Sequence, residues 1–342
     1  MLDQEKRNKG QYFTINNPFQ HPVFHYWLSL IENLEDKVFL EPFSGSNNIT
    51  LLIENVGYNN EWVCFDIDPE VVFQNKNPKY NININNSIEN FPKLGDVVIT
   101  NPPYLAKNSA KRRGLSYPDT RWDDLYKYSL ESMLDNIDFV AAIIPESFLT
   151  QGIFHDRLFA TISLTTKMFD DTDCPVCLAL FVDNKTKSKL FHEKNNFLLY
   201  QNEVLLGNYF GILEKVCFPE EIVSLKFNDI KGELGLIAVD STSGESIRFI
   251  DPDLIPNSEI KVSSRSRTKI KISDITLSSD EVSELMRECN RIIDKYREDT
   301  HDIFLTSFKG LRKDGKYRRR LDFKNAKSII NMAYYNILKK GD

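Results

Sequence analysis

The chain has 342 residues, of which 41% are hydrophobic and 27% charged, and its formal net charge is −6. This composition excludes a disordered chain, a collagen-like fibre and a coiled coil, and the length suits about two domains. No apolar run approaches the ~18 residues that span a bilayer, and the charged start does not resemble a signal peptide. Five scattered cysteines do not suggest a disulfide framework, so we expect a cytoplasmic protein without membrane partners.

The first half of the chain alternates short apolar runs with longer amphipathic stretches. Strands are predicted at Val38–Phe43, Trp62–Asp68, Asp96–Thr100, Phe139–Pro145 and Val176–Val182. A helix is expected at Ile49–Val56, after the first strand. Near-continuous apolar strands separated by helices indicate an α/β fold with a mostly parallel sheet covered on both faces. Such sheets bind their ligands at the carboxyl ends of the strands.

The pattern changes after the charged run Asp183–Lys189, which suggests a domain boundary between residues 183 and 184. Beyond it, Leu234–Ile275 has alternating, turn-rich segments that indicate an irregular β-rich unit. Helices are predicted at Ser279–Asp299 and Ser328–Leu338. If Ser279 is taken as the N-cap of the first of these helices, a capping box would need Glu or Gln three residues later. That position is Val282, so no capping box is predicted.

Charge is distributed unevenly along the chain. From Pro256 to Asp342 there are 20 Lys and Arg against 13 Asp and Glu, a balance of +7, which leaves −13 for the rest. Such an asymmetry fits a catalytic domain joined to a domain that binds a polyanion. A solvated basic surface is the alternative interpretation.

The sequence Asn101-Pro102-Pro103-Tyr104 directly follows an apolar strand. Two consecutive prolines donate no ladder hydrogen bonds, and the second restricts the first to extended geometry, so the loop is rigid with outward carbonyls. Asn101 adds an amide, and Tyr104 is expected to present an exposed aromatic face. The loop could therefore bind a planar, amine-bearing group through two hydrogen-bond acceptors, while the tyrosine ring stacks on that group. An ordinary strand-ending turn is the alternative.

A second group of residues lies near the ends of the first two predicted strands. Gly45 lets the backbone approach a ligand closely, and Glu41 can hydrogen-bond a cationic amino group. Asp66 follows Gly45 by 21 residues, which is the spacing of a ribose-binding carboxylate in doubly wound folds. A nicotinamide-dependent dehydrogenase is disfavoured, because its G-x-G-x-x-G turn is absent after this lone glycine.

Taken in order, these motifs resemble those of the γ-class N6-adenine DNA methyltransferases typified by the TaqI enzyme. Residues 9–14 look like the family's motif X, residues 41–47 like motif I and Asp66 like motif II, ahead of the Asn-Pro-Pro-Tyr loop. The resemblance covers roughly residues 8 to 183. It implies a Rossmann-like, seven-stranded, mostly parallel methyltransferase domain at 1–183 that binds S-adenosylmethionine. A smaller, basic target-recognition domain for DNA is then expected at 184–342.

The resemblance also implies roles for individual residues. The S-adenosylmethionine site would comprise Gln11, Tyr12, Phe13, Thr14, Glu41, Pro42, Phe43, Ser44, Gly45, Asn47, Asp66, Ile67, Asn86 and Ser87. This sequence departs from the family in lacking a further glycine in motif I and an acidic residue at the motif III position. The catalytic residues would be Asn101, Pro102, Tyr104 and Phe169, the last of which could instead belong to the core.

The implied reaction starts from an adenine extruded from duplex DNA. The side-chain oxygen of Asn101 and the carbonyl of Pro102 would accept both N6 hydrogens, while Tyr104 and Phe169 stack on the base. No general base is needed before methyl transfer, and no metal site is expected. The lone pair of cysteines at Cys174 and Cys177 is better explained as core than as a zinc site.

Basic residues predict where DNA is bound. The segment from Lys107 to Gly114 is polar and lacks apolar periodicity, so we expect a mobile loop that orders on phosphates; a solvated loop is the alternative. Alternate cations in 265–271 would line one face of a strand. The predicted DNA contacts are Lys107, Lys111, Arg112, Arg113, Arg265, Arg267, Lys269, Lys309, Arg312, Arg318, Arg319 and Arg320.

The expected partner is double-stranded DNA, bound by a monomer, with a cognate restriction endonuclease acting separately. Methyl transfer to RNA, to a protein glutamine or to cytosine N4 by the same fold remains an alternative, as does a catalytically silent DNA-binding protein. The motif X segment and the basic C-terminal region favour DNA. Intact Asn101 and Asp66 argue against a silent protein.

Overall fold

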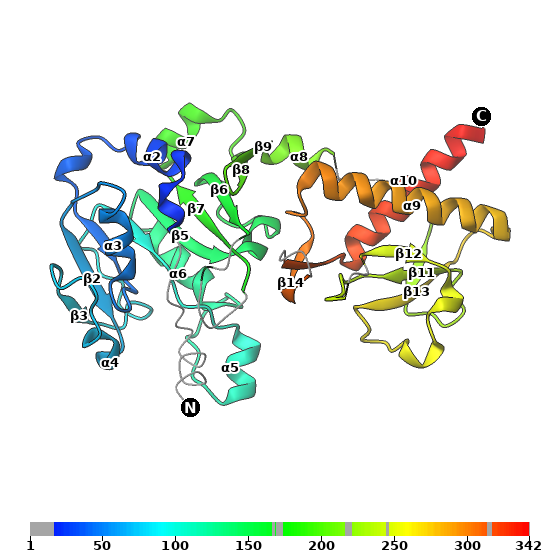
Figure 1. Ribbon diagram of the computed structural model, residues 1–342, viewed down its shortest axis with the longest axis horizontal. Helices are drawn as coiled ribbons and strands as arrows, with labels where there is room; N and C mark the ends of the chain where they lie inside the picture. Colours follow the sequence, from blue (N-terminus) through cyan, green and yellow to red (C-terminus); the bar gives the residue numbers. More distant parts are fainter. Residues whose placement is uncertain are drawn as a thin grey trace. The chain divides into compact units, whose positions relative to one another are not determined.

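The computed structural model describes residues 17–165, 168, 174–215, 221–243, 246–312 and 317–341. Two compact units are present, Met1–Asn208 and Tyr209–Asp342. Each has its own sheet (Figure 1). None of the helices in the described ranges is long and apolar enough to cross a membrane.

The described part of the first unit is built around a nine-stranded sheet in the order β3-β2-β1-β4-β5-β7-β6-β8-β9. Its strands are β1 (Phe39–Glu41), β2 (Trp62–Asp66), β3 (Ile82–Ile84), β4 (Val97–Thr100), β5 (Phe139–Pro145), β6 (Leu158–Leu164), β7 (Val176–Phe181), β8 (Leu198–Gln201) and β9 (Val204–Asn208). The five strands from β3 to β5 are parallel, and β7 runs antiparallel between β5 and β6. The first unit is therefore a mixed α/β domain with a largely parallel sheet.

The apolar runs explain which strands lie at the centre. β6 and β7 are buried along their whole length, and β5 along all but its two end residues, because nearly every side chain in them is aliphatic or small. Seven strands were predicted, and nine are found in the described residues. The additional pair is the hairpin β8–β9, which extends the sheet beyond β6.

This hairpin also explains why the first unit ends later than the sequence indicated. The predicted boundary at residues 183 and 184 falls between β7 and α7, inside the first unit. The charged run there forms α7 instead of a linker, because Asp183 caps the helix through the N–H groups of Lys185 and Thr186. The chain then returns to the sheet as β8.

Helical segments connect the strands of the first unit. They are η1 (Pro18–Gln20), α2 (Pro22–Ser29), η2 (Leu34–Asp36), α3 (Asn48–Glu54), α4 (Pro69–Val72), α5 (Lys107–Arg113), α6 (Leu125–Leu134), η3 (Glu146–Thr150) and α7 (Asn184–Leu190). Buried Trp27 of α2 donates its indole N–H to the carbonyl of Phe181 at 2.8 Å, which fixes this helix against the end of β7.

The second unit combines short strands with two long helices. Its elements are α8 (Tyr209–Leu213), β10 (Leu225–Phe227), β11 (Leu234–Ile237), β12 (Arg248–Ile250), η4 (Pro252–Leu254), η5 (Asn257–Glu259), β13 (Arg267–Ile272), α9 (Ser279–Thr300), β14 (Thr306–Leu311), β15 (Tyr317–Arg320) and α10 (Phe323–Gly341). The antiparallel sheet has the order β10-β13-β11-β12, and β14 pairs with β15 separately. Helix α9 packs on β12 and against α10 (Figure 1).

The start of α9 corrects one sequence-based expectation. Ser278, not Ser279, is the N-cap residue, and it forms a full capping box with Glu281. The box was missed because the cap was assigned to Ser279, the first residue of the helix, and not to the residue before it.

Candidate active site

Three strands of the first unit bring polar side chains to one edge of the sheet. Glu41 is the last residue of β1, Asp66 is the last of β2, and Asn101 directly follows β4. Because β1 lies between β2 and β4 and all three are parallel, their carboxyl ends meet at the same edge. The strand order reverses at β1, and doubly wound sheets bind their ligands at such a switch point. The structure thus brings together three of the residues that the sequence singled out.

Glu41 is completely buried at this edge. Its Oε1 accepts hydrogen bonds from the hydroxyl of Thr100 and, at 3.2 Å, from the N–H of Phe43. Its Oε2 has no partner among the described residues. Burial, with a smaller contribution from the charge of Asp66, raises the pKa of Glu41 to about 8 despite these two hydrogen bonds. A buried acceptor without a partner is costly and indicates that a donor belongs there.

The loop between β1 and α3 is held by Asp66. The N–H of Gly45 donates to Oδ2 of Asp66 at 2.8 Å, and the N–H of Asp68 donates to Oδ1 at 2.9 Å. Gly45 has a φ of +51°, a left-handed conformation that glycine adopts without strain. Burial raises the pKa of Asp66, although these backbone hydrogen bonds act to lower it. A carboxylate offers about four lone-pair sites, so Asp66 has capacity for further donors.

The other residues of this loop are mostly engaged in holding it. Ser44 binds the carbonyl of Phe65 through both its N–H and its hydroxyl. The Asn47 amide group donates to Asn75 and to the carbonyl of Tyr80. The Asn47 side-chain oxygen is buried and has no partner in the described part of the chain. Pro42 is buried and Phe43 half-buried beside them.

The ends of β2 and β3 add apolar surface to the same edge. Ile67, directly after Asp66, is 55% exposed, and Ile84 at the end of β3 is 64% exposed. Exposed aliphatic side chains at the carboxyl end of a sheet offer a flat ligand an apolar contact. Asn86 and Ser87 lie in the turn that follows β3, where Asn86 accepts the N–H of Ile88 and buried Ser87 accepts from Asn85.

The Asn-Pro-Pro-Tyr loop follows β4 as expected, but Tyr104 does not present its ring to solvent. Tyr104 is only 8% exposed, and its ring packs edge-on against Tyr126. Its hydroxyl lies 2.5 Å from both Oδ1 of Asn101 and the carbonyl oxygen of Ile143. The expectation of an exposed aromatic face was therefore wrong for this conformation, because the neighbouring strand β5 and helix α6 cover the ring. Pro102 is buried as well, and Asn101 is half-buried.

The basic segment after this loop is a helix, so the prediction of a mobile loop was wrong. Residues Lys107–Arg113 form α5, which ends at Gly114 in the left-handed conformation. Ala, Lys and Arg favour helices, and the buried Ala110 packs with Leu105 and Leu125. Asp124 fixes the base of this helix by accepting the N–H of Leu105 at 3.1 Å, and its burial raises the pKa of Asp124 to about 6.

Cations on α5 differ in their surroundings. Lys107 is exposed, donates to the carbonyl of Thr120 at 3.2 Å and lies over the ring of Tyr117. Lys111, Arg112 and Arg113 occupy its last turn and are exposed. The last turn of α5 therefore offers several cations to an anionic partner.

The predicted cations of the second unit separate into exposed and buried sets. Arg265 is exposed over the ring of Phe323, and Arg267 pairs with Glu259 at 3.3 Å. Lys269 and Arg319 are only 7% and 4% exposed. Lys269 donates to Asn257, and Arg319 donates to Ser307. These two buried cations stabilise the unit and have little surface for a phosphate.

Some predicted residues cannot be placed. Gln11, Tyr12, Phe13, Thr14 and Phe169 lie outside the residues that the structure describes, as does the side chain of Lys309. Two residues that hold predicted site residues in place were not identified from the sequence. Thr100 binds Glu41 across β1 and β4, and its position directly before Asn101 was the available signal. Asp240 lies at the centre of a cluster of arginines, and no sequence pattern around Asp240 predicts this contact.

No group of three or more His, Cys, Asp or Glu side chains in the described part of the chain could hold a metal ion. The candidate site brings together two carboxylates, an amide, backbone groups and apolar side chains, and these groups suit an organic ligand.

Comparison with known proteins adds a family match. Residues 23–170 match the Eco57I restriction-modification methylase family. The matched segment contains Glu41, Asp66 and the Asn-Pro-Pro-Tyr loop. The match covers less than half of the chain. No curated protein shows a significant match.

Three solved structures illustrate the similarity of the chain to known folds. The methyltransferase subunit of a type I restriction-modification system from Streptococcus thermophilus is 13% identical with a TM-score of 0.41, covering 56% of this chain and 47% of that one. A type I modification subunit from Vibrio vulnificus is 12% identical with a TM-score of 0.38, covering 59% and 49%. A protein from Listeria monocytogenes, described as a class I S-adenosylmethionine-dependent methyltransferase, is 14% identical with a TM-score of 0.41, covering 56% and 68%. The chain spans about half the length of the first two.

Proposed function

We propose that the protein is a site-specific DNA methyltransferase of the γ class, which transfers the methyl group of S-adenosylmethionine to N6 of an adenine flipped out of duplex DNA. The observation that carries the proposal is the meeting of Glu41, Asp66 and Asn101 at the switch point of the sheet. The family match over the same segment supports it.

The residues at this edge fit the proposed cofactor. The partnerless Oε2 of Glu41 is an acceptor for the ammonium of the methionine moiety. Asp66 has lone pairs for the ribose hydroxyls beyond those that bind Gly45 and Asp68. Exposed Ile67 would contact the adenine ring. When bound, S-adenosylmethionine supplies a sulfonium-activated methyl group, which the N6 lone pair attacks.

Asn101 and Pro102 would orient the amine that accepts the methyl group. Their oxygens would accept the two N6 hydrogens, which draws the nitrogen toward tetrahedral geometry and directs its lone pair away from the ring. As the new N–C bond forms, the bond between sulfur and the methyl carbon would break and leave a neutral thioether. The proton would leave N6 for solvent only afterwards, so the site needs no general base beforehand. The contribution of the protein is then positioning and electrostatics.

One role of Tyr104 would be to position the side chain of Asn101. Its hydroxyl holds the amide oxygen at 2.5 Å and limits the rotation of this side chain. Stacking on the flipped base, which would offset a few kcal/mol of extrusion energy, requires the ring to become exposed when the nucleotide enters. Tyr104 is thus proposed as both a positioning residue and a stacking platform.

The experiment compares wild type with Asn101→Ala in the transfer of labelled methyl groups from S-adenosylmethionine to unmethylated duplex DNA. We expect the variant to lose at least about 100-fold in rate, as for removal of other catalytic hydrogen-bonding groups, and to keep its affinity for S-adenosylmethionine. Asn136→Ala removes an exposed asparagine far along the sequence from the loop and should leave the rate unchanged. A wild type that transfers no label to DNA would contradict the proposal.

A further inference from the structure

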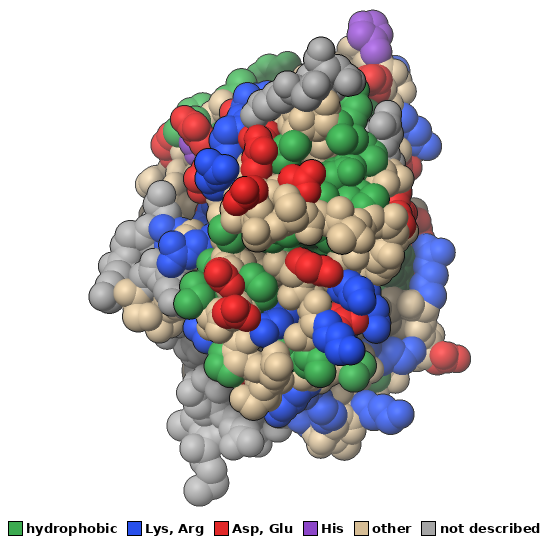
Figure 2. All heavy atoms as spheres, turned by 90° about the vertical axis from the view of Figure 1, so that its right-hand side faces the viewer, with side chains coloured by type: hydrophobic (Ala, Val, Ile, Leu, Met, Phe, Trp, Pro, Cys, Tyr) green, Lys and Arg blue, Asp and Glu red, His purple; other side chains and the backbone are tan. Residues whose placement is uncertain are grey.

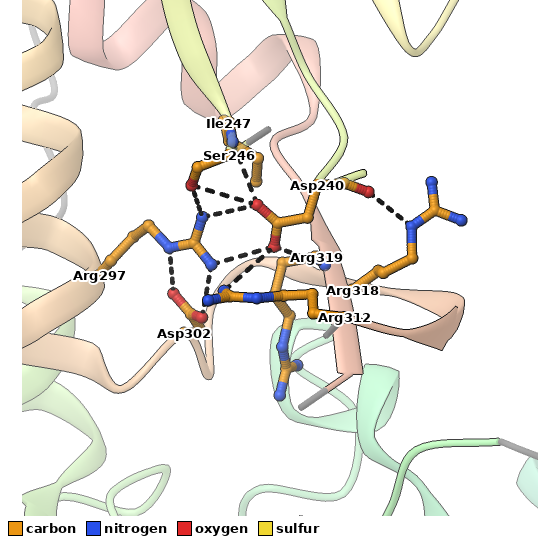
Figure 3. Close-up of polar contacts among 8 residues, drawn as sticks. All are labelled: Asp240, Ser246, Ile247, Arg297, Asp302, Arg312, Arg318 and Arg319. Carbon is orange, nitrogen blue, oxygen red and sulfur yellow. Dashed lines mark hydrogen bonds and ion pairs between the residues drawn. The ribbon is translucent and has the colours of Figure 1, made fainter. Parts of the chain in front are cut away.

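Asp240 is the centre of a buried polar cluster in the second unit (Figure 3). It is 1% exposed, and its carboxylate binds the Arg297 guanidinium through two hydrogen bonds of 2.8 and 3.0 Å. The N–H groups of Ile247 and Arg319 donate to the same carboxylate at 3.1 Å each. Arg312 lies 3.7 Å from its Oδ2. Burial acts to raise the pKa of Asp240, but the hydrogen bonds and charge of Arg297 outweigh it and lower the pKa.

This cluster joins the β14–β15 ribbon to the main sheet of the unit. The residue before Asp240, Val239, bridges to Arg320 at the end of β15. The N–H of Asp240 donates to the carbonyl of Arg319 at 3.0 Å, and the carbonyl of Asp240 accepts Nε of Arg318 at 2.5 Å. Main-chain and side-chain bonds from one residue therefore fix the second strand of the ribbon.

The ribbon has an inner and an outer face. Side chains alternate along β15, so buried Tyr317 and Arg319 face one way while the partly exposed Arg318 and Arg320 face the other. In Figure 3 the Arg318 side chain extends away from the carboxylate of Asp240. Nε of Arg320 is buried and has no acceptor among the described residues. Arg320 therefore has one N–H without a hydrogen bond in the described part of the chain.

Charge balance favours an anionic partner. The residues in Figure 3 include four arginines against two aspartates, so together they carry a formal charge of +2. Elsewhere the charge is mixed. Figure 2, which views one face of the chain, shows Lys and Arg interspersed with Asp and Glu, beside hydrophobic side chains. Strand β15 itself carries three consecutive arginines, Arg318, Arg319 and Arg320, and no acidic residue.

We propose that the β14–β15 ribbon binds duplex DNA, with Arg318 and Arg320 as the contacting residues and Asp240 as the residue that positions them. This inference rests on the proposed function, because it identifies the element that holds the DNA substrate. A two-stranded antiparallel ribbon fits the major groove of B-DNA, where arginine binds both phosphates and guanine edges. Arg297 and Arg319 hold the cluster together and do not contact DNA.

The test measures binding of the full chain to a fluorescent 30-bp duplex as salt is increased. The double variant Arg318→Ala/Arg320→Ala should bind at least tenfold more weakly at low salt. The slope of log affinity against log salt should fall by about 1 for each lost phosphate contact. Because the variant loses the hydrogen bond from Arg318 to the Asp240 carbonyl, it is compared at a temperature at which circular dichroism shows it folded, and its affinity for S-adenosylmethionine should match that of wild type. The control Arg287→Ala removes one exposed arginine from α9 and should give almost the wild-type slope.

Asp240→Asn tests the positioning role, because it removes no surface cation. We expect this variant to bind the duplex more weakly than wild type and to show a shallower slope of log affinity against log salt. Both are measured at a temperature at which circular dichroism shows a folded chain. A merely structural role would reduce the folded fraction without changing the slope. The Arg318 and Arg320 variant keeps the proposal falsifiable if the Asp240 variant does not fold.

The outcomes separate this inference from the proposed function. If wild type methylates duplex DNA but the ribbon variants bind like Arg287→Ala, the ribbon inference alone fails. If wild type binds duplex through the ribbon but transfers no methyl group, the inference stands and the proposed function fails. If wild type binds single-stranded RNA and no duplex, both fail.

Discussion

The hydroxyl of Tyr104 lies 2.5 Å from the side-chain oxygen of Asn101, within the rigid loop that follows β4. This contact makes Tyr104 part of the scaffold that orients the amide, because it limits the rotation of the half-buried Asn101 side chain. The ring of the tyrosine is itself held edge-on against Tyr126. The loop thus carries one side chain placed to accept hydrogen bonds and another that fixes it.

Substitution of Tyr104 should separate its two proposed contributions. Tyr104→Phe removes one hydrogen bond, worth about 0.5–1.5 kcal/mol, so kcat should fall by roughly 2- to 13-fold with an unchanged KM for DNA. Tyr104→Ala also removes the ring, and a further loss of about 1–3 kcal/mol should appear in kcat/KM. Steady-state methylation kinetics measure both. Equal activity of the two variants would contradict a stacking role, and Tyr26→Phe, at a half-exposed surface position, is the control.

Glu41 should make cofactor binding depend on pH. With a pKa of about 8, Glu41 is mostly protonated in the free protein at pH 7, and a bound ammonium favours its ionised form. Binding therefore releases a proton, and affinity for S-adenosylmethionine should rise by up to about tenfold per pH unit from pH 6 toward 8. Above about 8 the ammonium begins to lose its own proton, so the rise should end there.

Calorimetry in buffers of different ionisation enthalpy counts the released protons. Wild type should release close to one proton per complex near pH 7, and Glu41→Gln should release none while binding more weakly. An affinity that is the same at pH 6 and pH 8, with no proton release, would show that Glu41 does not meet the ammonium.

The Asp240 cluster should dominate the stability of the second unit. Asp240→Asn breaks a buried ion pair with Arg297, and such a loss typically costs about 3–5 kcal/mol in the free energy of unfolding. Because the pKa of Asp240 is lowered in the folded state, its stabilisation is present above the unfolded pKa of about 3.9 and is lost as pH falls through the folded value. Urea unfolding at pH 7 and pH 3 measures the effect.

The difference between wild type and this variant should therefore be large at pH 7 and smaller at pH 3. Asp294→Asn, at an exposed position on α9, should change the free energy of unfolding by less than about 0.5 kcal/mol. If both variants unfold alike at pH 7, the cluster does not stabilise the unit.

Helix α5 should contribute to DNA binding without affecting stability. Lys111→Ala/Arg112→Ala removes two exposed cations from its last turn, so the salt dependence of duplex binding should become shallower by up to about 2 units of slope. The matched control is Lys185→Ala/Lys189→Ala on α7, where both lysines are also exposed. Identical slopes for the two double variants would exclude α5 from the DNA-binding surface.

The sequence predicted the elements whose signal is local. β5 and β7 are continuous apolar runs, and Asp66 and Asn101 stand directly at strand ends, so their meeting at one edge follows from a parallel sheet. β6 was missed because buried Thr161 and Ser163 interrupt its apolar pattern. The β8–β9 hairpin was missed because its strands are short and partly exposed.

Other features depend on contacts between distant residues and could not be predicted. The burial of Tyr104 depends on Ile143 and Tyr126, and the role of Asp240 depends on Arg297 and Arg319. The helical form of α5 depends on one buried alanine, which gives no visible periodicity. Long-range hydrogen bonds of this kind leave no regular spacing along the chain.

The most direct test of the central claim is the chemical identity of the methylated product. The protein is expressed in a host that lacks DNA methylation. The deoxynucleosides from the genomic DNA of this host are separated and identified by mass spectrometry. We expect N6-methyldeoxyadenosine in DNA from cells that express wild type, and none in DNA from cells that express Asn101→Ala. Methylation of cytosine, or methyl groups found only in RNA or protein, would contradict it.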